Sequence, residues 1–438
     1  MEIIKQQKYP AYKPSGVEWL GEIPEHWEVL PGLRFIYENK DRNKGMIRNT
    51  VLSLSYGNIR VKGENELTGL VPESFETYQF VNKGDLIFRP TDLQNDTVSL
   101  RSSISEYEGI ITNAYLNLRF TSKANSKFYH YFFRAIDNNK VIYGLGSGLR
   151  QNISYLDFRR FQFPFPPLVE QTAIANFLDI KTAQIENAIA IKQKQIELLK
   201  ERRQILIHRA VTRGIGSLSG AETPDVKFKD SGVEWIGEIP EHWEVKALKY
   251  CTKIFRGKFT HRPRNDERLY DGNYPFFQTG DVARAGKFLF EYRQTLNDFG
   301  LRVSTLFPKG TIVITIAANI GDISILDIDA CFPDSIVGFE PMDFVDRDFL
   351  YNSLLVMKEQ FMSSTIKNTQ MNLNVDRIGV NSIAIPSKKE QLAINEYIEI
   401  ATTKISTAIS LKEKEIEKLK EYKSVLINEA VSGKIKVG

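Results

Sequence analysis

Two local clusters hold the side chains that are best suited to binding chemistry. Residues 253–264 contain six basic side chains and no acidic one, and Gly257 and Pro263 mark the segment as a loop. Arginine can donate a forked pair of hydrogen bonds to a guanine edge, and lysine and arginine neutralise phosphate. The segment therefore predicts contact with nucleic acid. The predicted contacts are Arg256, Lys258, His261, Arg262 and Arg264.

A glycine-rich loop over residues 144–152 is the second cluster. It ends in Arg, Gln and Asn, three side chains that suit the hydrogen-bonding edges of bases. Its glycine spacing is not G-x-G-x-x-G, so a dinucleotide site is not expected. An ordinary flexible surface loop is the alternative interpretation. The predicted contacts here are Ser147, Arg150, Gln151 and, directly after the strand-like run 86–88, Arg89.

Motifs that would carry catalysis are missing from the sequence. It contains no G-x-x-x-x-G-K-[ST], no H-E-x-x-H and no cysteine pair with zinc-ligand spacing. Residues 163–167 do not form the Asn/Asp-Pro-Pro-aromatic motif of adenine methyltransferases, because the first position lacks an amide or carboxylate. His26 and His242 belong to a repeated motif, where a structural role is expected. The sequence predicts binding without catalysis.

The elements that position these clusters are arranged as an internal repeat. Residues 15–29, SGVEWLGEIPEHWEV, recur at 231–245 with one substitution, and these two segments hold all four tryptophans. Glu-Gln pairs at 170–171 and 390–391 each open a long helical pattern, four residues after a proline. The offset is 216 residues at the tryptophan motif and 220 at the helices. Such a period is too long for a solenoid and indicates a duplicated module.

Each helical pattern carries a stripe at alternating steps of four and three, which indicates a coiled-coil seam. Seven of its eight positions are identical in the two helices, and it spans 26 residues, or ~39 Å at ~1.5 Å per residue. The simplest pairing is antiparallel, within one chain. The seam residues are Ile185, Ile189, Lys192, Ile196, Leu199, Arg203, Leu206 and Ala210 in the first helix, and Ile405, Ile409, Lys412, Ile416, Leu419, Lys423, Leu426 and Ala430 in the second.

Two features of the helices leave alternatives open. The polar seam residues either fix register and partner, or only extend their stems along the seam toward solvent. Ile191, Leu198 and Ile205 form a second apolar stripe off the main seam. That stripe is covered by a globular segment of its own module or by another protein.

The expected fold class is α+β, with two mixed α/β globular segments and two long helices in an antiparallel coiled coil. Strand-like runs include 51–55, 86–88 and 310–316. The predicted division is a globular segment at 1–166, a helix at 167–215, a linker at 216–225, a second globular segment at 226–385 and a helix at 386–438. Outside the tryptophan motif the two globular segments share pattern but little identity, which suggests similar folds with different surfaces.

Composition limits the class of protein. The 438 residues carry a net charge of only +4, so the case for nucleic-acid binding rests on the local clusters. Two cysteines cannot form a disulfide framework, which fits a reducing compartment. No apolar stretch reaches the ~20 residues that a bilayer requires. A soluble cytoplasmic protein is expected.

Taken together, the repeated tryptophan motif, the Pro-x-x-x-Glu-Gln openings and the two unlike globular segments resemble the specificity subunit of Type I restriction-modification systems. The resemblance covers essentially the whole chain and extends to 274–276 with 279–282, and to 150–154. The second globular segment departs from the family pattern at 368–373.

The resemblance implies that each globular segment is a target recognition domain that reads one half of a bipartite, asymmetric DNA site. The helices would fix the spacer between the half-sites. Two methyltransferase subunits would modify adenine with S-adenosylmethionine, and two translocase-nuclease subunits would use ATP and Mg²⁺. This subunit itself would hold no cofactor and no catalytic residue. Within this interpretation loops 256–264 and 144–151 read bases, and 277–284 assists through Thr279, Asp281 and Arg284.

Three alternatives remain open at this stage. The chain could be an orphan subunit without active partners, or a coiled-coil scaffold with two protein-binding heads, a function that suits its near-neutral charge. An enzyme, either a nuclease or a fused methyltransferase, is disfavoured by the missing motifs.

Overall fold

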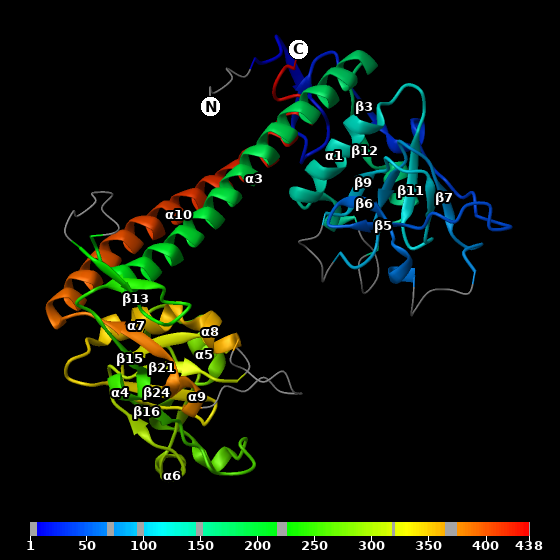
Figure 1. Cartoon of the computed structure of the whole chain (residues 1–438). Coiled ribbons are helices and arrows are strands. Elements are labelled where there is room, and N and C mark those ends of the chain that lie inside the picture. The colour runs from blue at the N-terminus through cyan, green and yellow to red at the C-terminus, as the bar shows by residue number, and fades with distance from the viewer. Residues whose placement is uncertain are drawn as a thin grey trace. The chain divides into compact units, whose positions relative to one another are not determined.

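The computed structural model describes residues 7–67, 74–93, 100–145, 152–216, 226–317, 320–363 and 375–437 (Figure 1). The chain divides into two compact units. Unit 1 comprises Met1–Gln193 and Glu413–Gly438, and unit 2 comprises Lys194–Lys412. Each unit therefore combines one globular segment, here called head 1 or head 2, with half of each long helix. Most of the predicted linker, residues 217–225, lies outside the described residues.

Head 1 is built on an antiparallel sheet of order β4-β11-β8-β9, packed against helix α1. Its buried core is rich in aromatic side chains, among them Phe88, Phe128, Phe132 and Phe163. The strands are β1 (Tyr12–Pro14), β2 (Glu22–Pro24), β3 (Glu28–Pro31), β4 (Ile36–Glu38), β5 (Leu52–Ser55), β6 (Asn58–Val61), β7 (Gln79–Val81), β8 (Leu86–Phe88), β9 (Ser102–Ile104), β10 (Gly109–Ile111), β11 (Leu116–Phe120) and β12 (Gln162–Phe165). The helices are α1 (Ser126–Asn138) and α2 (Tyr155–Arg160).

Head 2 repeats this framework as the sheet β16-β24-β21-β22-β18 and adds a second sheet, β19-β17-β23-β20. The strands are β13 (Phe228–Asp230), β14 (Glu238–Pro240), β15 (Glu244–Ala247), β16 (Thr252–Arg256), β17 (Tyr270–Phe276), β18 (Phe288–Leu289), β19 (Gln294–Leu296), β20 (Leu306–Phe307), β21 (Ile312–Thr315), β22 (Ile323–Leu326), β23 (Ala330–Cys331), β24 (Ile336–Pro341) and β25 (Ser382–Ile385). The helices are α4 (Leu248–Cys251), α5 (Thr279–Arg284), α6 (Asp298–Arg302), α7 (Arg347–Val356), α8 (Lys358–Ser363) and α9 (Val375–Val380).

The three predicted strand runs are confirmed as β5, β8 and β21. The prediction that residues 253–264 are all loop is wrong for its first part. Strand β16 continues to Arg256, because Ile254 and Phe255 pair with β24 in an antiparallel ladder. The predicted loop therefore begins only at Gly257.

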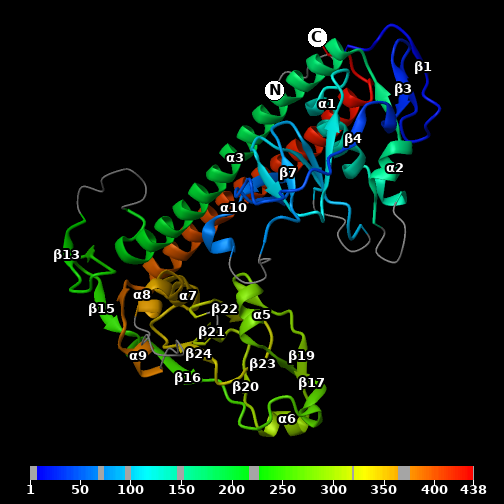
Figure 2. The same ribbon diagram turned by 90° about the vertical axis from the view of Figure 1, so that its right-hand side faces the viewer.

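The two long helices are α3 (Leu168–Arg213) and α10 (Lys388–Val431), and in each unit their halves lie antiparallel (Figures 1 and 2). In unit 1 the Lys192 ammonium pairs with Glu415 at 2.5 Å, and that of Lys423 pairs with Glu186 at 2.5 Å. In unit 2 Lys412 donates to Gln195 Oε1 at 2.7 Å. Three of the four polar seam residues thus bond across to the other helix, which favours a role in register.

The apolar stripe off the seam is not buried by its own module. Ile191, Leu198 and Ile205 remain 51%, 52% and 46% exposed. The repeat-related residues Leu411 and Val425 of α10 are also exposed. Each unit therefore leaves apolar helix surface uncovered. Among the residues that the structure describes, no helix combines the length and the apolar character needed to cross a membrane.

The tryptophan motif and the Glu-Gln pair meet where each head joins its long helix. In unit 1, Glu170 accepts hydrogen bonds from Trp27 Nε1 at 2.9 Å, from His26 at 2.6 Å and from the Tyr9 hydroxyl at 3.0 Å. Gln171 accepts from the backbone N–H of Asn125, the residue that caps α1. These contacts connect one helix start to two parts of the head.

Unit 2 repeats these contacts. Glu390 accepts from Trp243 Nε1 at 3.2 Å and from His242 at 2.8 Å, and Gln391 accepts from the backbone N–H of Asp346, which caps α7. The two histidines therefore have the structural role expected from the repeat. The near-identity of the two motifs has a physical reason, because both must build the same joint.

Candidate nucleic-acid interface

Strand pairing in head 2 brings together segments that are far apart in the sequence. Phe276 of β17 lies beside Cys331 of β23 in a parallel pair, and the Phe277 N–H donates to the Cys331 carbonyl at 2.9 Å. The Lys258 N–H donates to the Phe332 carbonyl at 3.1 Å. The predicted contact segments 256–264 and 277–284 are thereby each joined, through Lys258 and Phe277, to residues 331–332, where the loop at 332–335 begins.

Gly257 is required for this approach. A Cβ atom at this position would lie 2.2 Å from the Pro333 carbonyl oxygen and 2.5 Å from the Phe332 ring. No side chain fits there without a backbone shift. The glycine therefore lets the basic loop lie directly on the 332–335 loop.

Three arginines converge on Asp334. Arg264 pairs with its carboxylate at 2.5 Å, Arg262 lies 3.9 Å from the second carboxylate oxygen, and Arg256 Nε donates to its backbone carbonyl at 2.5 Å. One carboxylate balances only one of the three guanidinium charges. Arg262 and Arg264 remain 56% and 46% exposed, so the cluster presents positive charge and guanidinium donors to solvent. This is surface chemistry that suits phosphate or base edges.

Two other predicted contacts of this loop differ in their surroundings. Lys258 is exposed. His261 Nε2 lies 2.9 Å from Asp266 Oδ2, and Arg268 pairs with the same carboxylate at 2.7 Å. The hydrogen bond from Arg268 is the main reason that the pKa of Asp266 is lowered well below its usual value. His261 thus helps to hold the shape of the loop.

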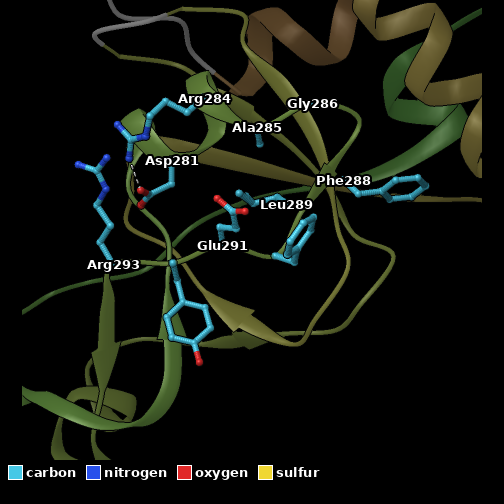
Figure 3. Close-up of a pocket in the computed structure, with 10 residues that line it drawn as sticks. Asp281, Arg284, Ala285, Gly286, Phe288, Leu289, Glu291 and Arg293 are labelled. Carbon is cyan, nitrogen blue, oxygen red and sulfur yellow. Dashed lines mark hydrogen bonds and ion pairs between the residues drawn. The ribbon is translucent and has the colours of Figure 1, made fainter. Parts of the chain in front are cut away.

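Helix α5 carries the predicted residues Thr279, Asp281 and Arg284. Asp281 is only 6% exposed; its carboxylate accepts from the Gln278 N–H at 2.7 Å and pairs with Arg284 at 2.5 Å. A buried carboxylate in these contacts positions its neighbours and does not face solvent. Arg284, at 51% exposed, is the surface group that it orients (Figure 3). Thr279 is partly buried at the first position of α5.

A surface pocket of about 360 Å³ lies beside α5, lined by Asp281, Arg284 and residues 285–286 and 288–293 (Figure 3). Arg284 and Arg293 extend on the same side as Asp281 in this view. Arg293 and the nearby Gln294 are exposed polar residues that sequence reasoning missed. No motif marks them, since Arg293 directly precedes the short strand β19 and Gln294 is its first residue.

In head 1 a buried arginine shapes the segment that carries Arg89. Arg101 is fully buried, and its guanidinium donates to the carbonyls of Thr91 at 2.7 Å and Asp92 at 3.0 Å. The Asp92 N–H in turn donates to Asn152 Oδ1 at 3.2 Å. Arg89 therefore lies close to the point where the glycine-rich loop re-enters the fold. Sequence reasoning missed Arg101, which no pattern distinguishes from a surface arginine.

Other predicted positions lie outside the described residues: Ser147, Arg150 and Gln151 of the glycine-rich loop, and 368–373 of head 2.

The described part of the chain holds neither a metal-ligand cluster nor an accessible thiol. It contains no group of three or more His, Cys, Asp or Glu side chains that could hold a metal ion. The cysteines Cys251 and Cys331 are free and buried, and burial raises the pKa of the Cys251 thiol to about 11. The arrangement can bind an anionic or hydrogen-bonding ligand; these residues form no nucleophile–base pair.

Comparison with known proteins gives a consistent result. The family model described as "Type I restriction modification DNA specificity domain" matches residues 34–201 and 240–421. The putative type I restriction enzyme MjaX specificity subunit of Methanocaldococcus jannaschii is 24% identical over 95% of this chain and 96% of its own length. The EcoBI specificity subunit of Escherichia coli is 25% identical over 56% of this chain and 53% of its own length.

Two solved structures share the fold at 14% identity. One, described as "Structural basis underlying complex assembly and conformational transition of the type I R-M system", has a TM-score of 0.71 and covers 93% of this chain and 98% of that chain. The HsdS subunit from Thermoanaerobacter tengcongensis has a TM-score of 0.55, with 94% of this chain and 98% of that chain covered. The expected fold class, two mixed α/β segments joined by long helices, is confirmed.

Proposed function

The chain belongs to the family of Type I restriction-modification specificity subunits, and from this premise we propose that each head reads one half of a bipartite, asymmetric DNA site. The observation that carries the proposal is the duplication itself. The two heads keep the same joint to the helices, through Glu170 and Glu390, but carry different surfaces. Two unlike surfaces on one repeated framework suit two unlike half-sites.

For head 2 we place the DNA contact at the arginine cluster around Asp334 together with α5. Arg262, Arg264 and Arg284 are exposed donors of the kind that contacts phosphate and guanine. For head 1 the contact includes Arg89 and the glycine-rich loop with Ser147, Arg150 and Gln151.

The helices are proposed to fix the spacer between the half-sites. A seam of ~39 Å is of the order of one turn of B-DNA, ~34–36 Å, which suits half-sites on one face of the duplex. The cross-helix bonds of Lys192, Lys412 and Lys423 support a fixed register, because a slip of one helix would break them.

The chain is proposed to direct partner subunits and to perform no chemistry itself. Two methyltransferase subunits, with S-adenosylmethionine, and two translocase-nuclease subunits, with ATP and Mg²⁺, would supply the reactions. Support for protein partners comes from the exposed apolar stripe of Ile191, Leu198 and Ile205, which no element of its own module buries. Apolar helix surface of this kind is typical of protein contacts.

Base-resolution mapping of adenine methylation in the source genome, with and without this gene, tests the proposal. We expect a gapped, asymmetric motif that disappears on deletion. A contiguous motif lost on deletion would contradict the two-headed arrangement. If deletion leaves methylation unchanged, the chain is an orphan subunit or a scaffold, and salt-dependent duplex binding by the purified protein separates these two, because counterion release requires phosphate contacts.

A further inference from the structure

Two glutamines of head 2 form an amide pair at the start of α5 and β19. In the antiparallel pair of β17 and β19, Phe276 lies opposite Gln294. Gln278 follows two residues later, and its Nε2 donates to Gln294 Oε1 at 3.1 Å. Gln278 belongs to the segment that runs beside the 332–335 loop, where Arg262 and Arg264 converge on Asp334. Gln278 is also the residue directly before α5, so the pair adjoins the α5 part of the proposed DNA contact.

The amide pair gives its two members different tasks. Gln294 is exposed, whereas Gln278 is partly buried and held by the bond between its backbone N–H and Asp281 at 2.7 Å. The bond from Gln278 fixes the orientation of the Gln294 amide. Because this bond uses only one lone pair of Gln294 Oε1, the second lone pair and both Nε2 hydrogens remain for bonds to a ligand. One donor and one acceptor on a glutamine amide match the N7 and N6 groups of adenine in the major groove.

Charged groups around the pair suit a nucleic-acid strand. Arg293, the residue before Gln294, is exposed, and no hydrogen bond or ion pair to another described residue engages its guanidinium. Arg284 and Arg293 line the same pocket, together with the carboxylates of Asp281 and Glu291. Asp281 is paired with Arg284, which leaves Arg293 as the exposed guanidinium for a phosphate contact, beside the Glu291 carboxylate in the same pocket.

We propose that Gln294 reads an adenine edge in the half-site bound by head 2, and that Gln278 is a positioning residue that presents the Gln294 amide. This inference rests on the proposed function and deepens it, since it assigns one base of one half-site to one side chain. A glutamine that is already fixed in orientation loses less side-chain freedom on binding, so the pair is better suited to readout than either residue alone.

The test uses the full chain in its source strain, with adenine methylation mapped at base resolution. Gln294→Ala should make one A·T position of one half-site degenerate and leave the other half-site unchanged. For duplexes with and without that A·T pair, the wild-type chain should discriminate by about 5- to 150-fold, and Gln294→Ala should lose this preference. Gln278→Ala should weaken discrimination at the same position, and the double variant should match Gln294→Ala, because a positioning residue has no effect without its target.

A control variant and the wild-type strain distinguish failure of this inference from failure of the proposed function. Gln162→Ala, an exposed strand glutamine of head 1, should leave the motif intact. An unchanged motif in Gln294→Ala, or degeneracy at a G·C pair or in both half-sites, would overturn the inference. So would complete loss of methylation in both Gln294→Ala and the isosteric Gln294→Glu while their melting temperatures match the wild type. Absence of any gapped motif in the wild-type strain would instead refute the proposed function.

Discussion

Glu390 closes the joint between head 2 and α10, and we expect Glu390→Ala to lower the free energy of unfolding by about 2–4 kcal/mol. Trp243 is buried, and its indole N–H would lose its acceptor, which costs ~1–3 kcal/mol for a buried donor. Glu390 also accepts from the Ser387 hydroxyl at 2.7 Å and the Ser387 N–H at 3.1 Å, in the turn before α10. Loss of such a helix-start contact adds ~0.5–2 kcal/mol.

The effect of this substitution should depend on pH. Burial raises the pKa of Glu390, but hydrogen bonds from Ser387, His242 and Trp243 outweigh it and lower the pKa to about 2. A carboxylate whose pKa is lower in the folded state stabilises that state fully above its unfolded pKa of ~4.3. The stability difference between wild type and variant should therefore shrink as the pH falls from about 5 to about 2.

Denaturant and thermal unfolding followed by tryptophan fluorescence provide the assay, since all four tryptophans lie in the two repeated motifs and Trp27 and Trp243 bond directly in the joints. At ~2–4 °C per kcal/mol for a unit of this size, the melting temperature should fall by about 4–16 °C. The control is Glu396→Ala, an exposed glutamate on the same helix, which should stay within ~0.5 kcal/mol of wild type. If Glu390→Ala lowers the free energy of unfolding by no more than this control does, the stability of the joint does not depend on the hydrogen bond from the buried indole.

Three further predictions concern single side chains of the two heads. Arg264→Ala should reduce the slope of log affinity against log salt by about one and relax only the half-site of head 2, as measured by duplex titration at several salt concentrations and by methylation mapping. Arg101→Met should destabilise head 1, because the carbonyls of Thr91 and Asp92 lose their donor, and should impair only the other half-site, with unfolding curves and the same mapping as the readouts. Cys251, with a pKa of about 11, should react with iodoacetamide at pH 8 far more slowly in the folded than in the unfolded chain.

Sequence patterns could predict the features of the fold that repeat. The seam of α3 and α10, the duplication and the strands β5, β8 and β21 all follow from periodicity or composition. The seam was predictable because a spacing of four and three over several heptads has no other common explanation. The extension of β16 to Arg256 was not predictable, because glycine and proline dominate the pattern further along the same segment.

The candidate site was predictable only in part. Arg262 and Arg264 are found by local charge, but Asp334 lies 70 residues beyond Arg264 in the chain and joins them through the antiparallel pairing of β16 and β24 and the bond from Lys258 to Phe332. Single residues brought together by tertiary pairing leave no local signal. The same reason explains why Arg101 and Gln294 were missed.

The two copies of the module differ in a way that divides structural from recognition residues. Each copy keeps a glutamate that accepts from a buried tryptophan and a glutamine that accepts from a capping backbone N–H. The acceptors beside the seam are less strictly repeated, because Glu415, which pairs with Lys192, corresponds to Gln195, which bonds Lys412. The ion pair in unit 1 is thus replaced in unit 2 by a hydrogen bond from the lysine to a neutral amide. The joint must have one geometry in both copies, whereas exposed cross-helix bonds contribute only ~0–1 kcal/mol each and tolerate change. Surface loops carry still fewer structural constraints, so they can differ completely and supply two different recognition surfaces on one repeated framework.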